Sequence, residues 1–136
     1  MKFGFIKVAA ASPLVQVADC FYNIQQIEGL MRKASEQEVE LIVFPEMSVT
    51  GYTCMDLFTQ EALLQSAEKA LLQLVEKTSD LPLLSIVGMP LYTENQLYNT
   101  AVAFQKGKIL GVVPKTYLSN YKEFQELNNS SIFDYI

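Results

Sequence analysis

The sequence predicts an α/β fold in which a mixed sheet is flanked by helices. In the first half of the chain, apolar runs typical of strands alternate with runs typical of helices, which is the order of β-α-β units. In the second half, two more strand-like runs are separated by a two-residue turn, which adds antiparallel strands. The chain has 136 residues, of which 50% are hydrophobic and 18% are charged. That balance is typical of a folded domain with one buried core, so we expect residues 1–136 to form one unit.

The first half is expected to form a strand, a helix and a second strand parallel to the first. Phe3–Ala10 is apolar and extended, and is expected to be a buried strand. Asp19 can cap the helix that follows. Glu40–Phe44 is a short β-branched and aromatic run that a proline stops. The helix is indicated by apolar residues at helical spacing, namely Phe21, Ile24, Ile27, Met31 and Ala34.

The second half adds a helix and three strands. An irregular segment over 46–58 leads into a helix over 59–77, followed by a strand over 83–87. Gly88, Pro90 and the polar TENQ stretch predict a turn, and Leu97–Gln105 and Lys108–Val113 then predict a hairpin across Lys106-Gly107. The apolar stripe of the second helix is expected to consist of Leu64, Ala67, Leu71, Leu74 and Val75.

Charge and side-chain chemistry exclude several classes of function. The net charge of −5 argues against a nucleic-acid partner. The chain has no histidine, and Cys20 and Cys54 are too far apart for a zinc-ligand spacing or a disulfide framework, so we expect no metal site. Lys7 interrupts the apolar N-terminal run, which argues against a signal peptide, and no apolar run is long enough to span a bilayer. We therefore expect a soluble cytoplasmic protein with reduced thiols.

Two irregular segments, 45–58 and 114–121, follow the C-terminal ends of predicted strands, where open α/β sheets bind ligands. Glu46 begins the first segment and Lys115 stands at the equivalent place in the second. A carboxylate there suits a general base, and an ammonium group can stabilise a developing oxyanion. Taken singly, Glu46 is better explained by a loop cap or salt bridge and Lys115 by a solvated surface lysine, and only their equivalent places on the sheet favour chemistry. The sequence does not set the distance between them.

More polar residues follow Lys115. Tyr117, Asn120 and Tyr121 carry hydroxyl and amide groups that can orient a small polar substrate, or form a polar loop whose tyrosines pack on apolar neighbours. Glu126 can lie one or two helical turns further on and point back at this loop, or belong to a solvated helix face.

Three stretches carry a family resemblance. FPEMSVTGY, GYTCMDLF and LYNTAVAFQKGKILGVVPKTYLSNYKEFQE resemble the carbon–nitrogen hydrolase (nitrilase) superfamily, and within it the glutaminase domain of glutamine-dependent NAD synthetases. The resemblance implies a nitrilase-like α-β-β-α sandwich with a Glu-Lys-Cys triad, of which residues 1–136 are the N-terminal part. It implies that Glu46 is the general base and that Lys115 stabilises the tetrahedral intermediate. It also implies that Tyr121 and Glu126 bind the substrate.

The resemblance also implies a reaction. Members of that family hydrolyse glutamine in this domain and pass the ammonia to a separate ATP-dependent synthetase domain, which amidates deamido-NAD. We expect that second domain, with its ATP and magnesium, to be absent from these 136 residues, because they contain no SGG-type phosphate loop. The family's cysteine nucleophile lies beyond the lysine, and neither Cys20 nor Cys54 takes its place. The chain alone is therefore expected to be inactive.

A missing second sheet would leave one face of the first sheet exposed, so we also expect a homo-oligomer. Two other functions stay open. One is a free-standing amidase of the same superfamily that acts on another small amide or nitrile. The other is an inert interaction module that kept the fold and lost the nucleophile. Residues 51–58 and 115–126 favour the glutaminase, and the missing cysteine favours the inert module.

Overall fold

The computed structural model describes residues 4–51 and 61–115, which form one five-stranded sheet and two helices. The strands lie in sequence order, with β1, β2 and β3 parallel and β3, β4 and β5 antiparallel. This confirms the predicted α/β class and the mixed sheet. The elements are β1 (Val8–Ala10), α1 (Cys20–Glu36), β2 (Leu41–Val43), α2 (Glu61–Lys77), β3 (Leu84–Thr93), β4 (Gln96–Gln105) and β5 (Lys108–Pro114).

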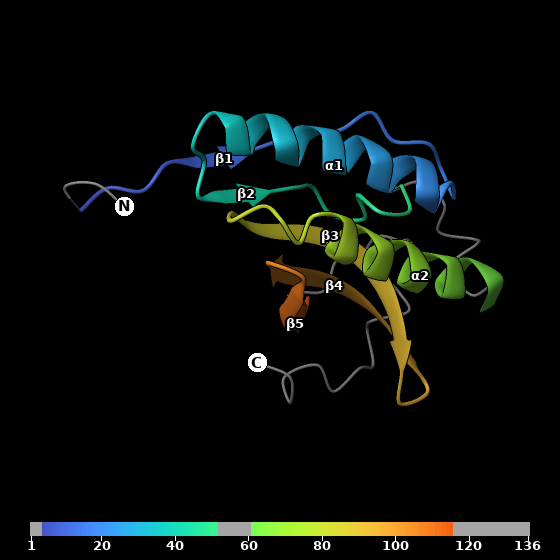
Figure 1. The fold of residues 1–136 in the computed structure, drawn as a ribbon. Coiled ribbons are helices and arrows are strands. Elements are labelled where there is room, and N and C mark those ends of the chain that lie inside the picture. Colours follow the sequence, from blue (N-terminus) through green and yellow to red (C-terminus); the bar gives the residue numbers. More distant parts are fainter. Residues whose placement is uncertain (1–3, 52–60, 116–136) are drawn as a thin grey trace.

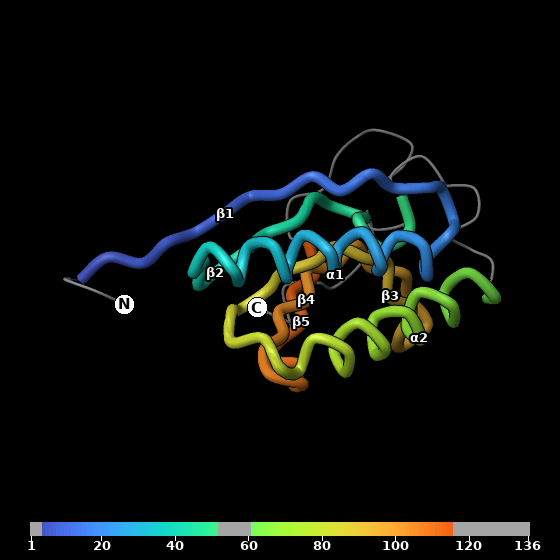
Figure 2. Tube along the Cα trace, turned by 45° about the horizontal axis from the view of Figure 1, so that its top comes forward, coloured from blue at the N-terminus to red at the C-terminus, as the bar shows by residue number. Residues whose placement is uncertain are grey.

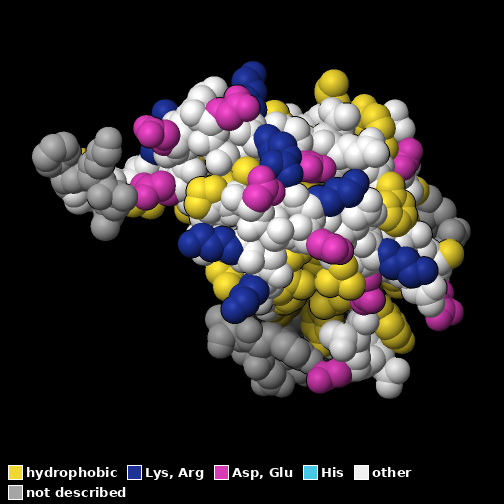
Figure 3. All heavy atoms as spheres, in the orientation of Figure 1, with side chains coloured by type: hydrophobic (Ala, Val, Ile, Leu, Met, Phe, Trp, Pro, Cys, Tyr) yellow, Lys and Arg dark blue, Asp and Glu magenta, His cyan; other side chains and the backbone are white. Residues whose placement is uncertain are grey.

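The two helices lie side by side and cover the same face of the sheet (Figures 1 and 2). The core lies between the helices and that face, where Ile27, Met31, Leu74, Val87 and Phe104 are almost completely buried. Charged side chains of both signs are spread over the helices, and hydrophobic side chains gather below α2 (Figure 3). No helix within residues 4–51 and 61–115 has the length and apolar character needed to cross a bilayer.

Helix α1 begins as predicted and differs on one face. The Asp19 side chain caps it by accepting a hydrogen bond from the Tyr22 backbone N–H at 3.1 Å. The expected apolar stripe is buried from Ile24 onward. Phe21, however, is exposed, and the first turn buries Cys20 and the polar Asn23 instead. The prediction for Phe21 was wrong because hydrogen bonds to neighbouring loops draw Asn23 into the interior.

Helix α2 is described from Glu61 onward, and residues 59–60 lie outside the described part. Leu64 is only half-buried, contrary to prediction, because the neighbouring Leu63 faces the core instead. Ala67 and Ala70 are fully buried. Their small side chains let α2 approach α1 and the sheet closely.

The first strand is shorter and more exposed than predicted. Only Val8–Ala10 pairs with β2, and Val8 is 56% exposed. The physical reason is that β1 is an edge strand and that no described element covers the sheet face opposite the helices. In register, Val8, Leu41 and Leu84 form one row of side chains on this open face.

The turn predicted over Gly88, Pro90 and the TENQ stretch is confirmed at TENQ, but strand β3 continues through Gly88 and Pro90. Gly88 and Pro90 pair with β4, and the chain reverses only at Glu94 and Asn95, both of which have positive φ. The pairing of β3 with β2 ends at Ile86, so β3 is an edge strand at Pro90. An edge position tolerates the missing N–H of proline, which is why the prediction of a turn at this point was wrong.

The hairpin between β4 and β5 is confirmed. Lys106 and Gly107 have φ of 50° and 80°, as a tight two-residue turn requires. The register then shifts by one residue: Phe104 pairs with Ile109, but Ala103 pairs with Gly111. Leu110 is the extra residue of this β-bulge.

Candidate active site

The first half of the site is a tight turn over residues 45–51 that follows β2. Three backbone hydrogen bonds close it, the shortest from the Gly51 N–H to the Met47 carbonyl at 2.7 Å. Met47 has a φ of +55°, which is uncommon for a residue other than glycine, and its side chain is buried. Because this conformation of Met47 is unfavourable by itself, the packing around the turn must maintain it. The turn in this way fixes the position of the neighbouring Glu46.

This turn crosses strand β3 at Gly88. A Cβ added to Gly88 would lie 2.5 Å from the Met47 nitrogen and 2.8 Å from the Glu46 Cα, closer than real Cβ atoms come to backbone. The Gly88 N–H donates to Ser48 Oγ at 3.2 Å, and the Gly88 carbonyl accepts from the Val49 N–H at 3.1 Å. Gly88 thus provides both the space and the hydrogen bonds that seat the Glu46 turn.

The second half of the site is Lys115, directly after β5. Its backbone N–H donates to the Asn99 carbonyl at 2.8 Å, which continues the β4–β5 ladder by one residue. Its Nζ lies 2.8 Å from Oε1 of Glu46, within hydrogen-bonding and salt-bridge distance. The structure therefore brings together two residues that are 69 positions apart in the sequence.

Glu46 and Lys115 are accessible to a ligand. Their side chains are 43% and 24% exposed, so both charged groups are partly open to solvent. Both residues line a cavity of about 480 Å³ on the open sheet face, and Glu46 also borders a second hollow of about 410 Å³ beside Pro13 and Val15. The remaining lining of the first cavity is mostly apolar and includes Val43, Phe44, Ile86, Ala101, Val113 and Pro114.

A buried amide anchors the turn from the other side. Asn23 of α1 is fully buried, and its Nδ2 donates to the Gln16 and Val49 carbonyls, both at 2.8 Å. Its Oδ1 accepts from the Gln16 N–H at 2.7 Å. A backbone hydrogen bond, from the Ala18 N–H to the Thr50 carbonyl, also joins the loop before α1 directly to the turn that carries Glu46. Asn23 therefore joins helix α1, the loop before it and the turn that carries Glu46.

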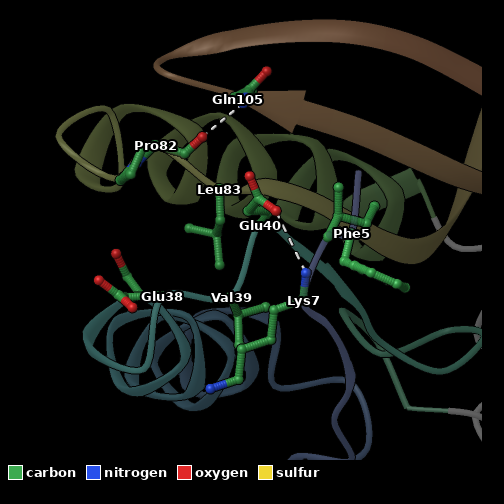
Figure 4. A pocket seen from close by; sticks show the side chains of 10 residues that line it. Phe5, Lys7, Glu38, Val39, Glu40, Pro82, Leu83 and Gln105 are labelled. Atoms are coloured by element: carbon green, nitrogen blue, oxygen red, sulfur yellow. Dashed lines mark hydrogen bonds between the residues drawn. The ribbon is translucent and has the colours of Figure 1, made fainter. Parts of the chain in front are cut away.

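A larger hollow, of about 730 Å³, lies at the opposite end of the sheet (Figure 4). It is lined by residues that precede the parallel strands, including Phe5, Lys7, Glu40 and Leu83. The Lys7 backbone N–H contacts the Glu40 carboxylate at 3.4 Å, and the Lys7 Nζ donates to the Gln37 carbonyl. Ligands of open α/β sheets bind at the C-terminal ends of the strands, so the Glu46–Lys115 cavity is the better candidate site.

The other predicted site residues, Tyr121 and Glu126, lie outside the described residues, as do Tyr117, Asn120 and Cys54. Cys20 is buried at the start of α1. Within residues 4–51 and 61–115, no group of three or more His, Cys, Asp or Glu side chains is placed to hold a metal ion.

Sequence reasoning missed Asn99 and Gly88. Asn99 lines the Glu46–Lys115 cavity, and the signal for it was an amide within an otherwise apolar strand run. Gly88 was interpreted as a turn residue, although a glycine inside a strand is also typical of a close backbone approach.

Comparison with known proteins places this site in a family context. The carbon–nitrogen hydrolase family profile matches residues 7–133. A glutamine-dependent NAD(+) synthetase from Mycobacterium tuberculosis is 40% identical over 125 residues, which are 92% of this chain and 18% of that protein. A glutamine-dependent NAD(+) synthetase from Aquifex aeolicus is 36% identical over 110 residues, or 81% of this chain and 19% of that protein. This chain thus spans about a fifth of the length of these relatives.

Solved structures agree on the fold. A glutamine-dependent NAD(+) synthetase from Cytophaga hutchinsonii matches with a TM-score of 0.78 and 24% identity, over 85% of this chain and 20% of that chain. An amidase from Nesterenkonia sp., of the nitrilase superfamily, matches with a TM-score of 0.73 and 20% identity, over 89% and 46%. These likenesses confirm the predicted nitrilase-like fold class.

Proposed function

This chain belongs to the carbon–nitrogen hydrolase family, and from that premise we propose that its Glu46–Lys115 pair is the acid–base part of a site that hydrolyses the side-chain amide of glutamine. The observation that carries the proposal is the 2.8 Å contact between Lys115 Nζ and Glu46 Oε1 in an accessible, mostly apolar cavity. The two loops that carry these charges were predicted from the sequence as ligand-binding segments, and both follow the ends of strands in one sheet. The sequence likeness to glutamine-dependent NAD(+) synthetases supports glutamine as the substrate.

The two side chains have separate roles in this proposal. Glu46 accepts the proton of a cysteine thiol, and the thiolate attacks the carboxamide carbon of glutamine. The Lys115 ammonium stabilises the negative charge that develops on the carboxamide oxygen. Glu46 then returns the proton to the departing nitrogen, so that ammonia leaves and a thioester remains for water to hydrolyse. The family resemblance places the cysteine beyond Lys115, so the 136 residues alone are expected to be inactive.

The later use of the ammonia belongs to the same proposal. ATP-dependent amidation of deamido-NAD would take place in another part of a longer protein, because this chain contains no SGG-type phosphate loop and its described residues supply no metal-binding cluster. No step of the glutaminase reaction passes through ATP or magnesium. A cytoplasmic location and a homo-oligomeric state remain part of the proposal.

The test is glutamate formation from L-glutamine by the protein as its gene encodes it, with Glu46→Gln and Lys115→Met variants. We expect each substitution to lower kcat by at least about 100-fold, the usual effect of removing a general base or an oxyanion-stabilising charge. Matched controls are Glu68→Gln and Lys69→Met on the exposed surface of α2, which should stay within about twofold of wild type. If either the Glu46→Gln or the Lys115→Met variant turns over glutamine at the wild-type rate, the proposal is refuted.

The same assay separates the two alternatives. The Nesterenkonia amidase shares the fold, so turnover of a simple aliphatic amide in preference to glutamine would indicate a free-standing amidase instead. No turnover of any amide by the wild-type protein would indicate an inert interaction module.

A further inference from the structure

Asn99 lies next to Lys115, where strand β4 neighbours the end of the edge strand β5. It belongs to β4, where Pro90 of β3 is its partner on one side and Lys115, through the hydrogen bond to the Asn99 carbonyl, continues the ladder on the other. Side chains alternate along a strand, so Asn99 points to the same face as Ala101, which is exposed on the open side of the sheet. Asn99 and Lys115 therefore form a cross-strand pair whose side chains stand side by side.

The side chain of Asn99 has an unused hydrogen-bond donor. Asn99 is 4% exposed, and within the described residues its Nδ2 is buried and has no acceptor. Buried amide groups are almost always hydrogen-bonded, because an unpaired donor loses its water without compensation. The other side chains that line the cavity are apolar except for Glu46, Lys115 and Thr100, and the Thr100 hydroxyl already donates to the Met89 carbonyl. Since no acceptor is present among residues 4–51 and 61–115, a ligand bound in this cavity would supply one.

The position of the Asn99 Nδ2 donor indicates which chemical group of the ligand accepts its hydrogen bond. Asn99 borders the same cavity as Glu46 and Lys115, where the proposed reaction holds a carboxamide. The terminal torsion of an asparagine is soft, so the amide can turn its Nδ2 toward a ligand without a shift of the strand. Lys115 is the neighbour of Asn99 in the ladder and lines the same cavity, so one carboxamide oxygen can be contacted from both residues.

We propose that Asn99 is a substrate-binding residue of the Glu46–Lys115 site, whose Nδ2 donates a hydrogen bond to the carboxamide oxygen of a small amide substrate. This inference rests on the proposed function, and it adds a second donor to the oxygen that Lys115 stabilises. The bond strengthens as negative charge develops on that oxygen, so its loss lowers kcat as well as kcat/KM.

The decisive variant is Asn99→Leu, which keeps the branched shape of asparagine and removes both polar atoms. In the protein as its gene encodes it, we expect kcat/KM for L-glutamine to fall at least tenfold, while the melting temperature stays equal or rises because an unpaired donor has been removed. A structural role for Asn99 would instead lower the melting temperature. Asn99→Asp, which replaces the donor by an acceptor close to Glu46, should be impaired at least as strongly.

Ser85→Ala is the matched control. Ser85 is also fully buried on this sheet with an unpaired side-chain oxygen, but it pairs with Phe104 on the helix-covered face. Its substitution should leave both kcat and KM within twofold of wild type. If Asn99→Leu does not fold, Asn99→Ala is measured under the same criterion.

The outcomes are distinguishable. An active wild type with kcat/KM unchanged in Asn99→Leu overturns the role of Asn99 and leaves the proposed function standing. A wild type without glutaminase activity overturns both. A loss of activity in Asn99→Leu with an unchanged or higher melting temperature supports the inference.

Discussion

Gly88 lies directly against the backbone of Glu46, so closely that a Cβ on Gly88 would stand 2.8 Å from the Glu46 Cα. We predict that Gly88→Ala destabilises the chain by about 1–3 kcal/mol, the usual cost of forcing extra volume into a packed site. It should also displace Glu46 from Lys115 and thereby lower glutaminase activity. Urea unfolding of the 136-residue chain measures the first effect, and kinetics of the protein as its gene encodes it measure the second.

Gly29→Ala is the control for this substitution. Gly29 is exposed in α1, and an added Cβ would meet nothing within 4 Å. Replacing a helical glycine by alanine stabilises by about 0.5–1 kcal/mol. Equal responses of the two glycines would contradict the close packing of Gly88 under the Glu46 turn.

Asn23 is predicted to be the most sensitive residue on α1. Asn23→Ala deletes three hydrogen bonds and leaves backbone groups of Gln16 and Val49 without their partner. We expect a loss of at least about 2 kcal/mol in the free energy of unfolding. The exposed Gln25 on the same helix is the comparison, and Gln25→Ala should change that free energy by less than about 0.5 kcal/mol. A neutral Asn23→Ala would show that Asn23 does not anchor the loops.

The Glu46–Lys115 ion pair should contribute little to stability. Both side chains are partly exposed, and exposed ion pairs contribute about 0–1 kcal/mol. A double-mutant cycle of Glu46→Gln and Lys115→Met, followed by urea unfolding, should therefore give a coupling free energy below about 1 kcal/mol. A much larger coupling would mean that the pair is a structural element of the fold and would weaken its assignment to chemistry.

Acid should weaken one contact between helix α1 and the turn that follows α2. Arg32 of α1 donates to both carboxylate oxygens of Asp80, at 3.0 and 3.3 Å, and to the Lys77 carbonyl at 2.8 Å. The hydrogen bonds from Arg32 lower the pKa of the Asp80 carboxyl in the folded chain. The stability that results is present above the unfolded pKa of about 3.9 and is lost as the pH falls through the lower folded pKa.

Asp80→Asn tests this dependence. The variant should unfold at a lower urea concentration than wild type at pH 7, and the difference should shrink below about pH 4 and vanish in stronger acid. Glu68→Gln, an exposed carboxylate in the preceding helix α2, serves as the reference. A difference that persists unchanged down to pH 2 would assign the effect to something other than ionisation of Asp80.

The open sheet face predicts association of the 136-residue chain. Val8 belongs to that face and is 56% exposed, whereas Leu72 of α2 is 57% exposed on the helical side of the molecule. We expect light scattering to detect species larger than a monomer, and expect Val8→Lys to reduce them more than Leu72→Lys does. Equal effects of these two substitutions, or a monomer at every concentration, would contradict association through the sheet face.

The parts of the fold that local sequence signals determine were predicted well. Asp19 caps its helix, and Lys106-Gly107 forms its turn, because capping and turn chemistry need only neighbouring residues. Phe21 and Pro90 were placed wrongly because the decisive information is tertiary. Phe21 is exposed because Asn23 has partners in the preceding loop and in the distant turn after β2, and Pro90 fits a strand because β2 ends before reaching it.

In the candidate site too, features set by local sequence were predicted and features set by tertiary structure were not. Glu46 and Lys115 could be identified because each follows the end of a strand, within a stretch that resembles carbon–nitrogen hydrolases. Their contact could not be predicted, because it depends on the register of β4 and β5. Asn99 could not be identified as a site residue, because an amide in a strand becomes informative only when its unpaired state is known.

The β-bulge at Leu110 determines the face of the sheet on which Lys115 stands. If the ladder ran straight from the Gln105–Lys108 pair, Lys115 would lie opposite Tyr98 and point toward the helices. The extra residue shifts the count by one, so that Lys115 continues the ladder at Asn99 and points to the side of Glu46. The Glu46–Lys115 ion pair thus depends on the face of the sheet to which the alternation of side chains along β5 assigns Lys115. Deletion of Leu110 should preserve the pair by making the ladder regular, whereas insertion of one residue between Gly111 and Lys115 should turn the lysine away from its carboxylate.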